Sequence, residues 1–107
     1  MKERRRYKRF SLLIPLKIQR FYSNKIENTI TKDISQGGLR IKSDCFFMPK
    51  ERIKIILNNP IFNTVKGKVI WIKKMQLPDS FEAGIEFIEL DSYTRKLLFL
   101  KFLNFNL

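Results

Sequence analysis

The stretch Thr29–Lys42, with the sequence TITKDISQGGLRIK, is the part of the chain that decides the fold. It begins with a run rich in β-branched residues, passes through the turn-forming segment Ser35–Gly38, and ends where Leu39 and Ile41 alternate with basic residues. β-Branched runs and strict alternation are typical of strands with one buried face, and paired glycines mark a turn. We therefore expect two strands joined by a turn.

Four more segments show the same period of two, in chain order Leu12–Ile18, Ile53–Leu57, Thr64–Lys74 and Phe81–Phe87. Pro15 lacks an N–H group, so the first of them is predicted to be an edge strand or a locally irregular one. In the third, Trp71 shares a face with Val65 and Val69, which predicts that its indole lies in the core. Six short strands with tight connections favour a mainly β fold, an antiparallel barrel or sandwich.

The C-terminal part of the chain changes its period and predicts one helix. Asp91-Ser92 can cap the start of a helix, and Tyr93–Leu103 is rich in Leu and Lys and lacks Gly and Pro. The apolar residues Leu97–Leu100 and Phe102–Leu103 fall on more than one face of this helix. One face is expected to lie on the barrel. The other either sinks between barrel and loops or contacts a second copy of the chain or another protein.

The composition narrows the class of function. The chain has 107 residues, 44% of them hydrophobic, which is enough for one domain with a core. Lys and Arg number 22 against 10 Asp and Glu, so the net charge of +12 favours phosphorylated ligands, nucleic acid or acidic lipid as partners. The chain has no His for a Ser–His or Cys–His pair, and we expect neither an enzyme nor a metal site.

One cysteine and one short apolar run indicate in which cellular compartment the protein is expected. Cys45 has no second cysteine to pair with, which suits a reducing cytosol, and we expect it to be a buried filler. The apolar run Leu12–Leu16 follows basic residues but is too short for a signal peptide or a membrane span. A cytoplasmic protein without a membrane segment is predicted.

The N-terminal block Met1–Phe10 holds six basic residues against the single Glu3. Such a cluster repels itself and is predicted to be mobile until it binds an anion. We therefore divide the chain into a ligand-binding arm, residues 1–10, and a barrel with its helix, residues 11–107. Taken alone, a basic tail is usually a solvated segment or a non-specific phosphate contact.

The arm and the turn after Asp33 carry groups that suit a guanine nucleotide. Asp33 and Ser35 point to the same side of an extended strand end, and Gly37 and Gly38 permit positive φ and a close approach to the backbone. An arginine fork matches guanine O6 and N7, a carboxylate accepts from N1 and N2, and guanidinium groups bind phosphate. An Asp-x-Ser sequence alone, however, more often caps its own turn.

Two motifs stand in a fixed order with one predicted strand between them: Arg5-x-x-x-Arg9 and Asp33-x-Ser35-x-x-Gly38. This pair resembles the PilZ domain family, bacterial receptors for cyclic di-GMP. Two later segments are also similar to strands of that family: Gly67–Trp71 and Ala83–Phe87. The resemblance covers nearly the whole chain. It implies a six-stranded antiparallel β-barrel, a PilZ-like split barrel, with a C-terminal α-helix.

The resemblance also implies the ligand, cyclic di-GMP, and the residues that bind it. By role these are Arg5 and Arg9 for phosphate and guanine, Asp33 and Ser35 for a guanine edge, and Gly38, which leaves room for the base. Three neighbours belong to the expected site as well: Arg4, Arg6 and Gly37. The number of nearby cations, those of Arg4 and Arg6 included, would bias whether one nucleotide or a stacked pair is held.

The function implied is that of a receptor or adaptor: binding orders the arm against the barrel, and a downstream protein reads the changed surface. A basic β-barrel that binds RNA or DNA is the alternative, but it does not account for Asp33, an anion beside the proposed site. A third reading is a vestigial nucleotide site with a helix that docks a partner constitutively. In this family the position of Trp71 can lie near the ligand, although its face pattern favours the core.

Overall fold

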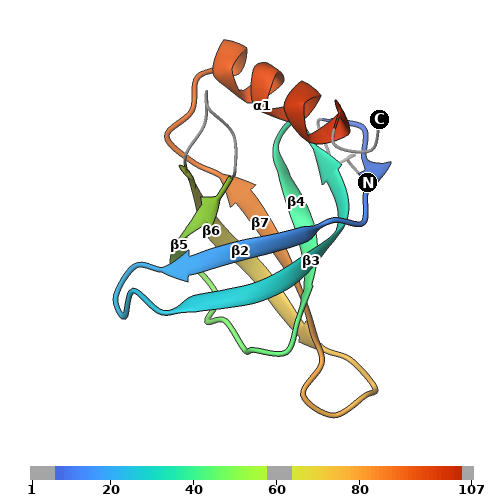
Figure 1. Ribbon diagram of the computed structural model, residues 1–107, viewed down its shortest axis with the longest axis vertical. Coiled ribbons are helices and arrows are strands. Elements are labelled where there is room, and N and C mark those ends of the chain that lie inside the picture. Colours follow the sequence, from blue (N-terminus) through green and yellow to red (C-terminus); the bar gives the residue numbers. More distant parts are fainter. Residues whose placement is uncertain (1–6, 58–63, 105–107) are drawn as a thin grey trace, which may run out of the picture.

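The computed structural model describes residues 7–57 and 64–104. In these residues the chain forms seven β-strands and one α-helix (Figure 1). The elements are, in chain order, β1 (Phe10–Ser11), β2 (Pro15–Arg20), β3 (Ile26–Ser35), β4 (Gly38–Ser43), β5 (Arg52–Ile56), β6 (Thr64–Lys74), β7 (Phe81–Phe87) and α1 (Ser92–Asn104). The six predicted strands correspond to β2–β7 and the predicted helix to α1.

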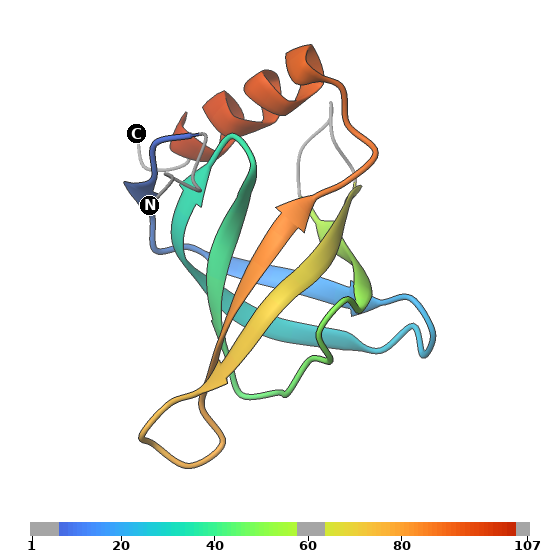
Figure 2. The same ribbon diagram turned by 180° about the vertical axis from the view of Figure 1, so that it is seen from behind.

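The strands β2 to β7 close into one antiparallel barrel. Their order is β2-β5-β6-β7-β4-β3, and β3 pairs with β2 to complete the ring. Figure 2 shows β4, β7 and β6 side by side on one wall of this barrel. The structure therefore confirms the predicted mainly β fold, a six-stranded antiparallel barrel with a C-terminal helix.

A short strand that the sequence did not indicate ties the N-terminal segment to the barrel. β1 pairs with the end of β3, with Phe10 opposite Ile34 and Ser11 opposite Asp33. The Phe10 ring lies 5.6 Å from the ring of Phe99 in α1. Phe10 is thus paired with the barrel and packed on the helix, whereas the predicted mobility of residues 1–10 stays a prediction, and residues 1–6 lie outside the described residues.

Pro15 is the first residue of β2, a place where a missing N–H group is tolerated. β2 pairs with β3 and, from Lys17 onward, also with β5, so the prediction of an edge strand is wrong. The other prediction for this segment, local irregularity, is confirmed. Just before β2, the Ile14 N–H group donates to the Thr31 side chain, with 3.0 Å between nitrogen and Oγ1.

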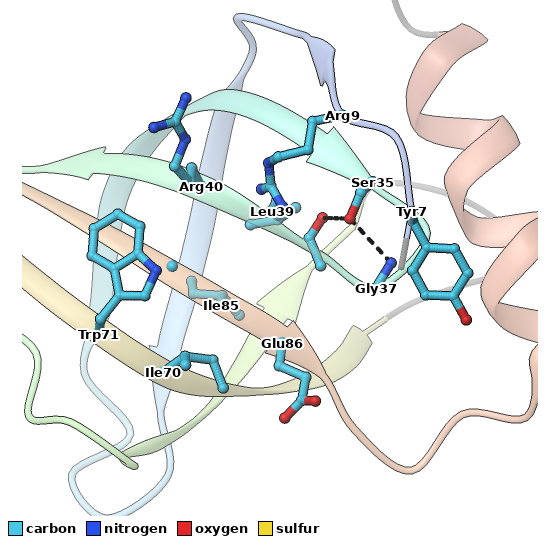
Figure 3. Close-up of a pocket in the computed structure, with 12 residues that line it drawn as sticks. Tyr7, Arg9, Ser35, Gly37, Leu39, Arg40, Ile70, Trp71, Ile85 and Glu86 are labelled. Atoms are coloured by element: carbon cyan, nitrogen blue, oxygen red, sulfur yellow. Dashed lines mark hydrogen bonds between the residues drawn. The ribbon is translucent and has the colours of Figure 1, made fainter. Parts of the chain in front are cut away.

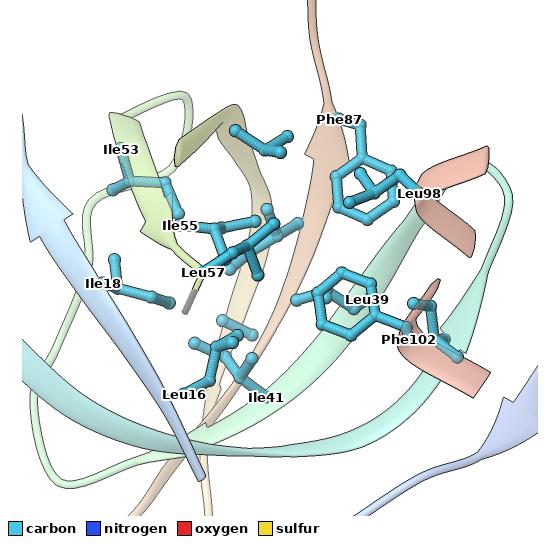
Figure 4. Close-up of a cluster of buried hydrophobic side chains, with 14 of the residues drawn as sticks. Leu16, Ile18, Leu39, Ile41, Ile53, Ile55, Leu57, Phe87, Leu98 and Phe102 are labelled. Atoms are coloured by element: carbon cyan, nitrogen blue, oxygen red, sulfur yellow. The ribbon is translucent and has the colours of Figure 1, made fainter. Parts of the chain in front are cut away.

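Apolar side chains from all six barrel strands fill the interior (Figure 4). Among them, Ile18, Ile41, Ile53 and Ile55 are completely buried. Burial of one such side chain contributes about 1.5–3 kcal/mol relative to leaving it exposed, so the interior is the main source of stability.

α1 lies across one end of the barrel and covers it (Figure 1). The side chains that it buries are Leu98, Phe99 and Phe102. The ring of Phe102 stacks on Phe87 of β7, with centroids 6.4 Å apart. At the start of α1 the Thr94 N–H group donates to Asp91 Oδ1 (2.7 Å), which confirms the predicted N-cap.

The opposite face of α1 carries two exposed apolar side chains, Tyr93 and Leu100. The predicted contact of one helix face with the barrel is thus confirmed, while contact of the other face with a second copy or another protein stays a prediction. Within the part of the chain that the structure describes, no helix has the length and apolar character needed to cross a membrane.

A β-bulge in β3 sets the direction of Asp33 and Ser35. The register with β4 shifts between Thr31 and Asp33, so that Thr31 and Ile34, on opposite parities, are both completely buried. One extra residue reverses the alternation beyond it. Asp33 and Ser35 therefore share the outer face of the barrel, as residues two apart in a strand must.

A second bulge, in β6, reverses the direction of Trp71. The register with β7 shifts between Val69 and Trp71, which leaves Ile70 as the extra residue. Val69 is completely buried, whereas Trp71 is 38% exposed. The prediction that Trp71 lies in the core is therefore wrong, because strict alternation does not continue through a bulge.

Cys45 is half-buried, and its thiol donates a hydrogen bond to Glu27 Oε1 (2.8 Å). This hydrogen bond and partial burial raise the pKa of the thiol. A thiol that stays protonated is a poor nucleophile, which agrees with the expectation of a packing role.

Candidate ligand-binding site

A pocket of about 530 Å³ lies on the outer face of the barrel, over β4, β7 and β6 (Figure 3). Its lining comes from the N-terminal segment, the β3–β4 turn and these three strands: Tyr7, Arg9, Ser35, Gly37, Gly38, Leu39, Arg40, Ile70, Trp71, Gly84, Ile85 and Glu86. A second hollow of about 590 Å³, between Leu16 and Phe102, is lined mainly by apolar side chains. Only the first combines arginines with aromatic rings, and we take it as the candidate site.

Two glycines of the pocket floor lie so close to neighbouring groups that a side chain at either position would force a shift. A Cβ atom on Gly84 would lie 2.3 Å from Trp71 Nε1, so a side chain there would push the indole off β7. A Cβ atom on Gly38 would lie 1.9 Å from the carbonyl oxygen of Ile85, so β4 and β7 could not pair at this distance. Strand packing alone thus requires glycine at position 38, and its predicted role of leaving room for a base stays a prediction.

Gly37 lies against the ring of Tyr7. A Cβ atom at this position would lie 3.2 Å from Tyr7 Cδ2. None of the four glycines, all of which the structure describes, has a positive φ. The positive φ that glycine permits at Gly37 and Gly38 is therefore not used in the structure, whereas the missing side chain is.

Asp33 lies between two arginines behind the rim of the pocket. Its Oδ1 accepts from Arg9, with 2.7 Å to Nε and 2.6 Å to Nη2. Its Oδ2 accepts from Arg40, with 2.6 Å to Nε and a further contact to Nη2. Each arginine therefore holds one carboxylate oxygen through two nitrogen atoms, which fixes the plane of its guanidinium group.

The protonation state of this cluster follows from its contacts. Burial of the Asp33 carboxylate by itself raises the pKa, but the hydrogen bonds and charges of Arg40 and Arg9 outweigh burial and lower the pKa below its usual value. The hydrogen bond to Asp33 in turn raises the pKa of Arg40. Asp33 is therefore ionised and Arg40 protonated near neutral pH.

Glu82 of β7 places a second carboxylate on the same outer face. Its Oε2 accepts from Lys32 Nζ (2.7 Å), and its Oε1 lies 3.6 Å from Arg40 Nη1. Burial opposes ionisation of Glu82, yet the neighbouring cations, Lys32 first, lower its pKa. Arg40 thus lies between two buried carboxylates, hydrogen-bonded to Asp33 and in a longer ion-pair contact with Glu82.

Ser35 closes the turn between β3 and β4. The Gly37 N–H group donates to Ser35 Oγ (3.1 Å), and Ser35 Oγ lies 3.4 Å from the Gly38 carbonyl oxygen (Figure 3). This is the turn-capping role that an Asp-x-Ser sequence most often has. Ser35 also belongs to the lining of the pocket, although it is only 4% exposed.

The structure brings five of the predicted site residues together. Arg9, Ser35, Gly37 and Gly38 line the pocket, and Asp33 holds Arg9 from behind. The other three predicted residues, Arg4, Arg5 and Arg6, lie outside the described residues. Among the residues that are described, no group of three or more Cys, Asp or Glu side chains is placed to hold a metal ion.

Sequence reasoning missed Arg40 and Tyr7, and it favoured the core for Trp71 although the family resemblance allowed a place near the ligand; all three line the pocket. A signal for Arg40 was present. A two-residue turn pairs Ser35 with Gly38 and therefore Asp33 with Arg40. The bulge that turns Trp71 outward and the packing of Tyr7 on Gly37 had no comparable sequence signal.

The arrangement suits a planar anion. Figure 3 shows Trp71 at one end of the pocket and Tyr7 at the other, with Arg9 and Arg40 along one side. Guanidinium forks bind phosphate oxygens and the O6 and N7 acceptors of guanine, and aromatic rings stack on base faces. The pocket therefore combines donors for phosphate or a purine edge with rings for a purine face.

Comparisons with known proteins agree on one family. The family model for the PilZ domain matches residues 3–102. No curated protein sequence matches the chain. The fold is similar to the PilZ domain of YcgR from Escherichia coli, solved with c-di-GMP, with a TM-score of 0.69 and 15% identity over 95% of this chain and 93% of that one.

Two longer proteins contain the same fold. The Bacillus subtilis inhibitor of motility, MotI/DgrA, has a TM-score of 0.72 and 18% identity over 98% of this chain and 52% of that one. MrkH of K. pneumonia, in a complex with c-di-GMP, has a TM-score of 0.67 and 17% identity over 89% of this chain and 49% of that one. This chain thus spans about half the length of both. Because the family model matches nearly every residue of the barrel and helix, the chain belongs to the PilZ domain family.

Proposed function

We propose that this protein is a receptor for cyclic di-GMP that binds the nucleotide in the pocket over β4, β7 and β6. The observation that carries the proposal is the pair Arg9 and Arg40, two oriented guanidinium groups beside the rings of Trp71 and Tyr7. YcgR and MrkH, which share the fold, were solved with c-di-GMP. Membership of the PilZ domain family adds independent support.

Each part of the ligand has a suitable partner in this proposal. Arg9, together with Arg5 from the N-terminal arm, binds phosphate and the O6 and N7 atoms of guanine, and Arg4 and Arg6 add positive charge. A bidentate arginine–guanine contact contributes about 1–3 kcal/mol of discrimination between bases. Ser35 offers a hydroxyl to a guanine edge, and the Trp71 ring stacks on the base.

We further propose that the output is a change of surface rather than a reaction. Arg9 lines the pocket, and the next residue, Phe10, packs on Phe99 of α1. A ligand that shifts Arg9 therefore also shifts Phe10 against α1. The arm and the exposed side of α1, with Tyr93 and Leu100, are then the surface that a downstream protein or a second copy reads.

Isothermal titration calorimetry of the purified chain with cyclic di-GMP, GMP and GTP tests the binding step. We expect saturable heat with cyclic di-GMP at micromolar concentrations and much weaker heat with GMP and GTP. Size-exclusion chromatography before and after loading reports any change of oligomeric state. A folded sample that gives no heat with cyclic di-GMP would refute the proposed function.

The nucleic-acid alternative predicts a different result. A basic barrel that binds single strands shows little base preference and a steep fall of affinity with salt. Titration of labelled single-stranded RNA at two salt concentrations separates the two functions. Tight RNA binding together with no response to cyclic di-GMP would favour the alternative.

A further inference from the structure

The carboxylate of Asp33 is fully engaged by arginines. A carboxylate offers about four lone-pair positions, and four nitrogen atoms, Nε and Nη2 of Arg9 and of Arg40, contact its two oxygens. Asp33 is 6% exposed, and among the described residues the pocket lining includes both arginines but not Asp33. A guanine edge can reach this carboxylate only by displacing an arginine.

Arg40 lines the pocket, so a ligand bound there would lie beside its side chain. On β4 it lies opposite Asp33 on one side and opposite Gly84 of β7 on the other. Trp71 of β6 lies opposite the same Gly84, so the guanidinium group and the indole flank one glycine. The Arg40 side chain is 31% exposed, against 20% for that of Arg9.

The two edges of the Arg40 guanidinium group differ. The Nε–Nη2 edge holds Asp33. The Nη1 end has a contact of 3.6 Å to Glu82, which is too long for a hydrogen bond. Among the described residues this end makes no hydrogen bond, so its N–H groups can donate to a ligand, and the fixed edge decides their direction.

We propose that Asp33 is a positioning residue that fixes the planes of Arg9 and Arg40, and that Arg40 contacts the bound nucleotide through its Nη1 end. The inference rests on the proposed function and deepens it by assigning one more binding residue. A guanidinium group that is already oriented loses less conformational freedom on binding than a free one. The shared chemistry of the target is an acceptor, either a phosphate oxygen or O6 and N7 of guanine.

The role of Arg40 is tested by calorimetry of Arg40→Gln and Arg40→Lys with cyclic di-GMP. We expect both variants to lose affinity by about tenfold or more, because Lys keeps the charge but not the fork. Comparison with the 7-deazaguanine analogue shows whether Arg40 contacts N7 or phosphate. Arg52→Gln, an exposed arginine of β5 that pairs with Glu89, is the matched control and should bind like the wild type. Wild-type affinity in both Arg40 variants would overturn this half of the proposal.

The role of Asp33 is tested with a second ligand, cyclic di-IMP, which lacks the guanine N2 amino group. If Asp33 acts through the arginines, Asp33→Asn weakens both ligands by the same factor, and the ratio of their affinities stays within about twofold of the wild-type ratio. The double variant Asp33→Asn/Arg40→Gln should bind little worse than the weaker single variant. A wild-type preference for cyclic di-GMP that disappears in Asp33→Asn would show direct contact with guanine and overturn the positioning role.

A ligand-free measurement separates failure of this inference from failure of the proposed function. In ¹⁵N NMR spectra, the Nε–H groups of Arg9 and Arg40 should exchange slowly with water in the wild type and rapidly in Asp33→Asn. Unchanged exchange in a folded Asp33→Asn protein would overturn positioning whatever the ligand. If the wild type shows protected Nε–H groups but no heat with cyclic di-GMP, the proposed function and the ligand contact of Arg40 fail, while the positioning role stands.

Discussion

Two clusters of arginine and carboxylate in this barrel have opposite compositions. The pocket cluster is one carboxylate between two arginines, namely Arg9, Asp33 and Arg40. The closed cluster is one arginine between two carboxylates, namely Arg20, Glu27 and Glu51, with 3.5 Å and 3.7 Å from Arg20 Nε to the two acids. Both are largely buried, so burial alone does not separate a binding site from a structural ion pair.

In the closed cluster, the remaining donors of Arg20 bind other groups of the protein. Arg20 Nη1 donates to the hydroxyl of Tyr22 (2.9 Å), Nη2 donates to the Phe46 carbonyl oxygen, and the guanidinium carbon lies 4.5 Å from the centre of the Phe47 ring. One side chain thus joins the β2–β3 hairpin to the loop after β4. The pocket cluster differs because its arginines also face an open pocket. Where the remaining donors point is therefore what distinguishes a binding cluster from a structural one.

The largest expected effect is on the closed cluster. Arg20→Met leaves Glu27 and Glu51 without their buried cation, and we expect the free energy of unfolding to fall by about 3–5 kcal/mol. Urea denaturation measures the change, with Arg52→Met as the control for removal of an exposed arginine. The fraction that remains folded should bind cyclic di-GMP like the wild type. If folded Arg20→Met protein binds cyclic di-GMP more weakly than the wild type, the closed cluster is not purely structural and the proposed distinction is wrong.

The next prediction compares a glycine that allows two strands of the pocket to pair with a glycine that makes room for a ligand-binding side chain. Gly38→Ala forces β4 away from the Ile85 carbonyl oxygen and should lower the free energy of unfolding by about 1–3 kcal/mol. Gly84→Ala meets the Trp71 side chain, which can move, so we expect a smaller loss of stability and a clear loss of affinity. Thermal denaturation and calorimetry on both variants make the comparison. Equal losses of stability in the two would contradict it.

A smaller effect is expected from the aromatic wall of the pocket. Trp71→Ala should weaken binding of cyclic di-GMP by about 1 kcal/mol, the low end of the range for one base stacked on one ring. Stability should change little because the side chain lies outside the core and is 38% exposed. Tyr93→Ala, which removes an exposed ring on α1, is the control for calorimetry. Unchanged affinity in Trp71→Ala would exclude stacking on this ring.

The smallest effect is a dependence on pH. The folded state lowers the pKa of Asp33, so its charge stabilises the fold fully above the unfolded pKa of about 3.9, and this contribution is lost as the pH falls through the folded pKa. Below about pH 4 the wild type should therefore lose stability more steeply than Asp33→Asn. The pKa of Glu82 is also lowered, but Glu82 is present in both proteins, so its contribution to the pH dependence of stability largely cancels in the comparison. Parallel stability curves, from urea denaturation at a series of pH values, would contradict the pKa shift.

Much of the fold could be predicted because it depends on local alternation. Thr29–Lys42 forms the hairpin expected from its pattern, and Asp91 caps α1 as its sequence indicated. The pattern failed at Trp71, since a bulge adds a residue without any change in residue type. The family resemblance supplied Arg9, which the structure places at Asp33, but gave no reason for Arg40.

The closed cluster could not be predicted for a different reason. Arg20 and Glu27 lie in the paired strands of the β2–β3 hairpin, but Glu51 joins them only through the long-range pairing of β2 with β5. Each of them occurs in a basic and acidic background where a charged residue is most often exposed. Tyr7 is a similar case, because nothing near it in the sequence indicates that its ring packs on Gly37.

The adjacency of Arg9 and Phe10 has a thermodynamic consequence. One residue lines the pocket and the next packs on α1, so in the proposed receptor a single peptide unit separates detection from output. Linkage makes such coupling reciprocal: a partner that grips α1 more tightly in the loaded state must raise the affinity for the nucleotide by the same factor. The nucleotide concentration that triggers a response in the cell is then set jointly by this chain and by the abundance of its partner.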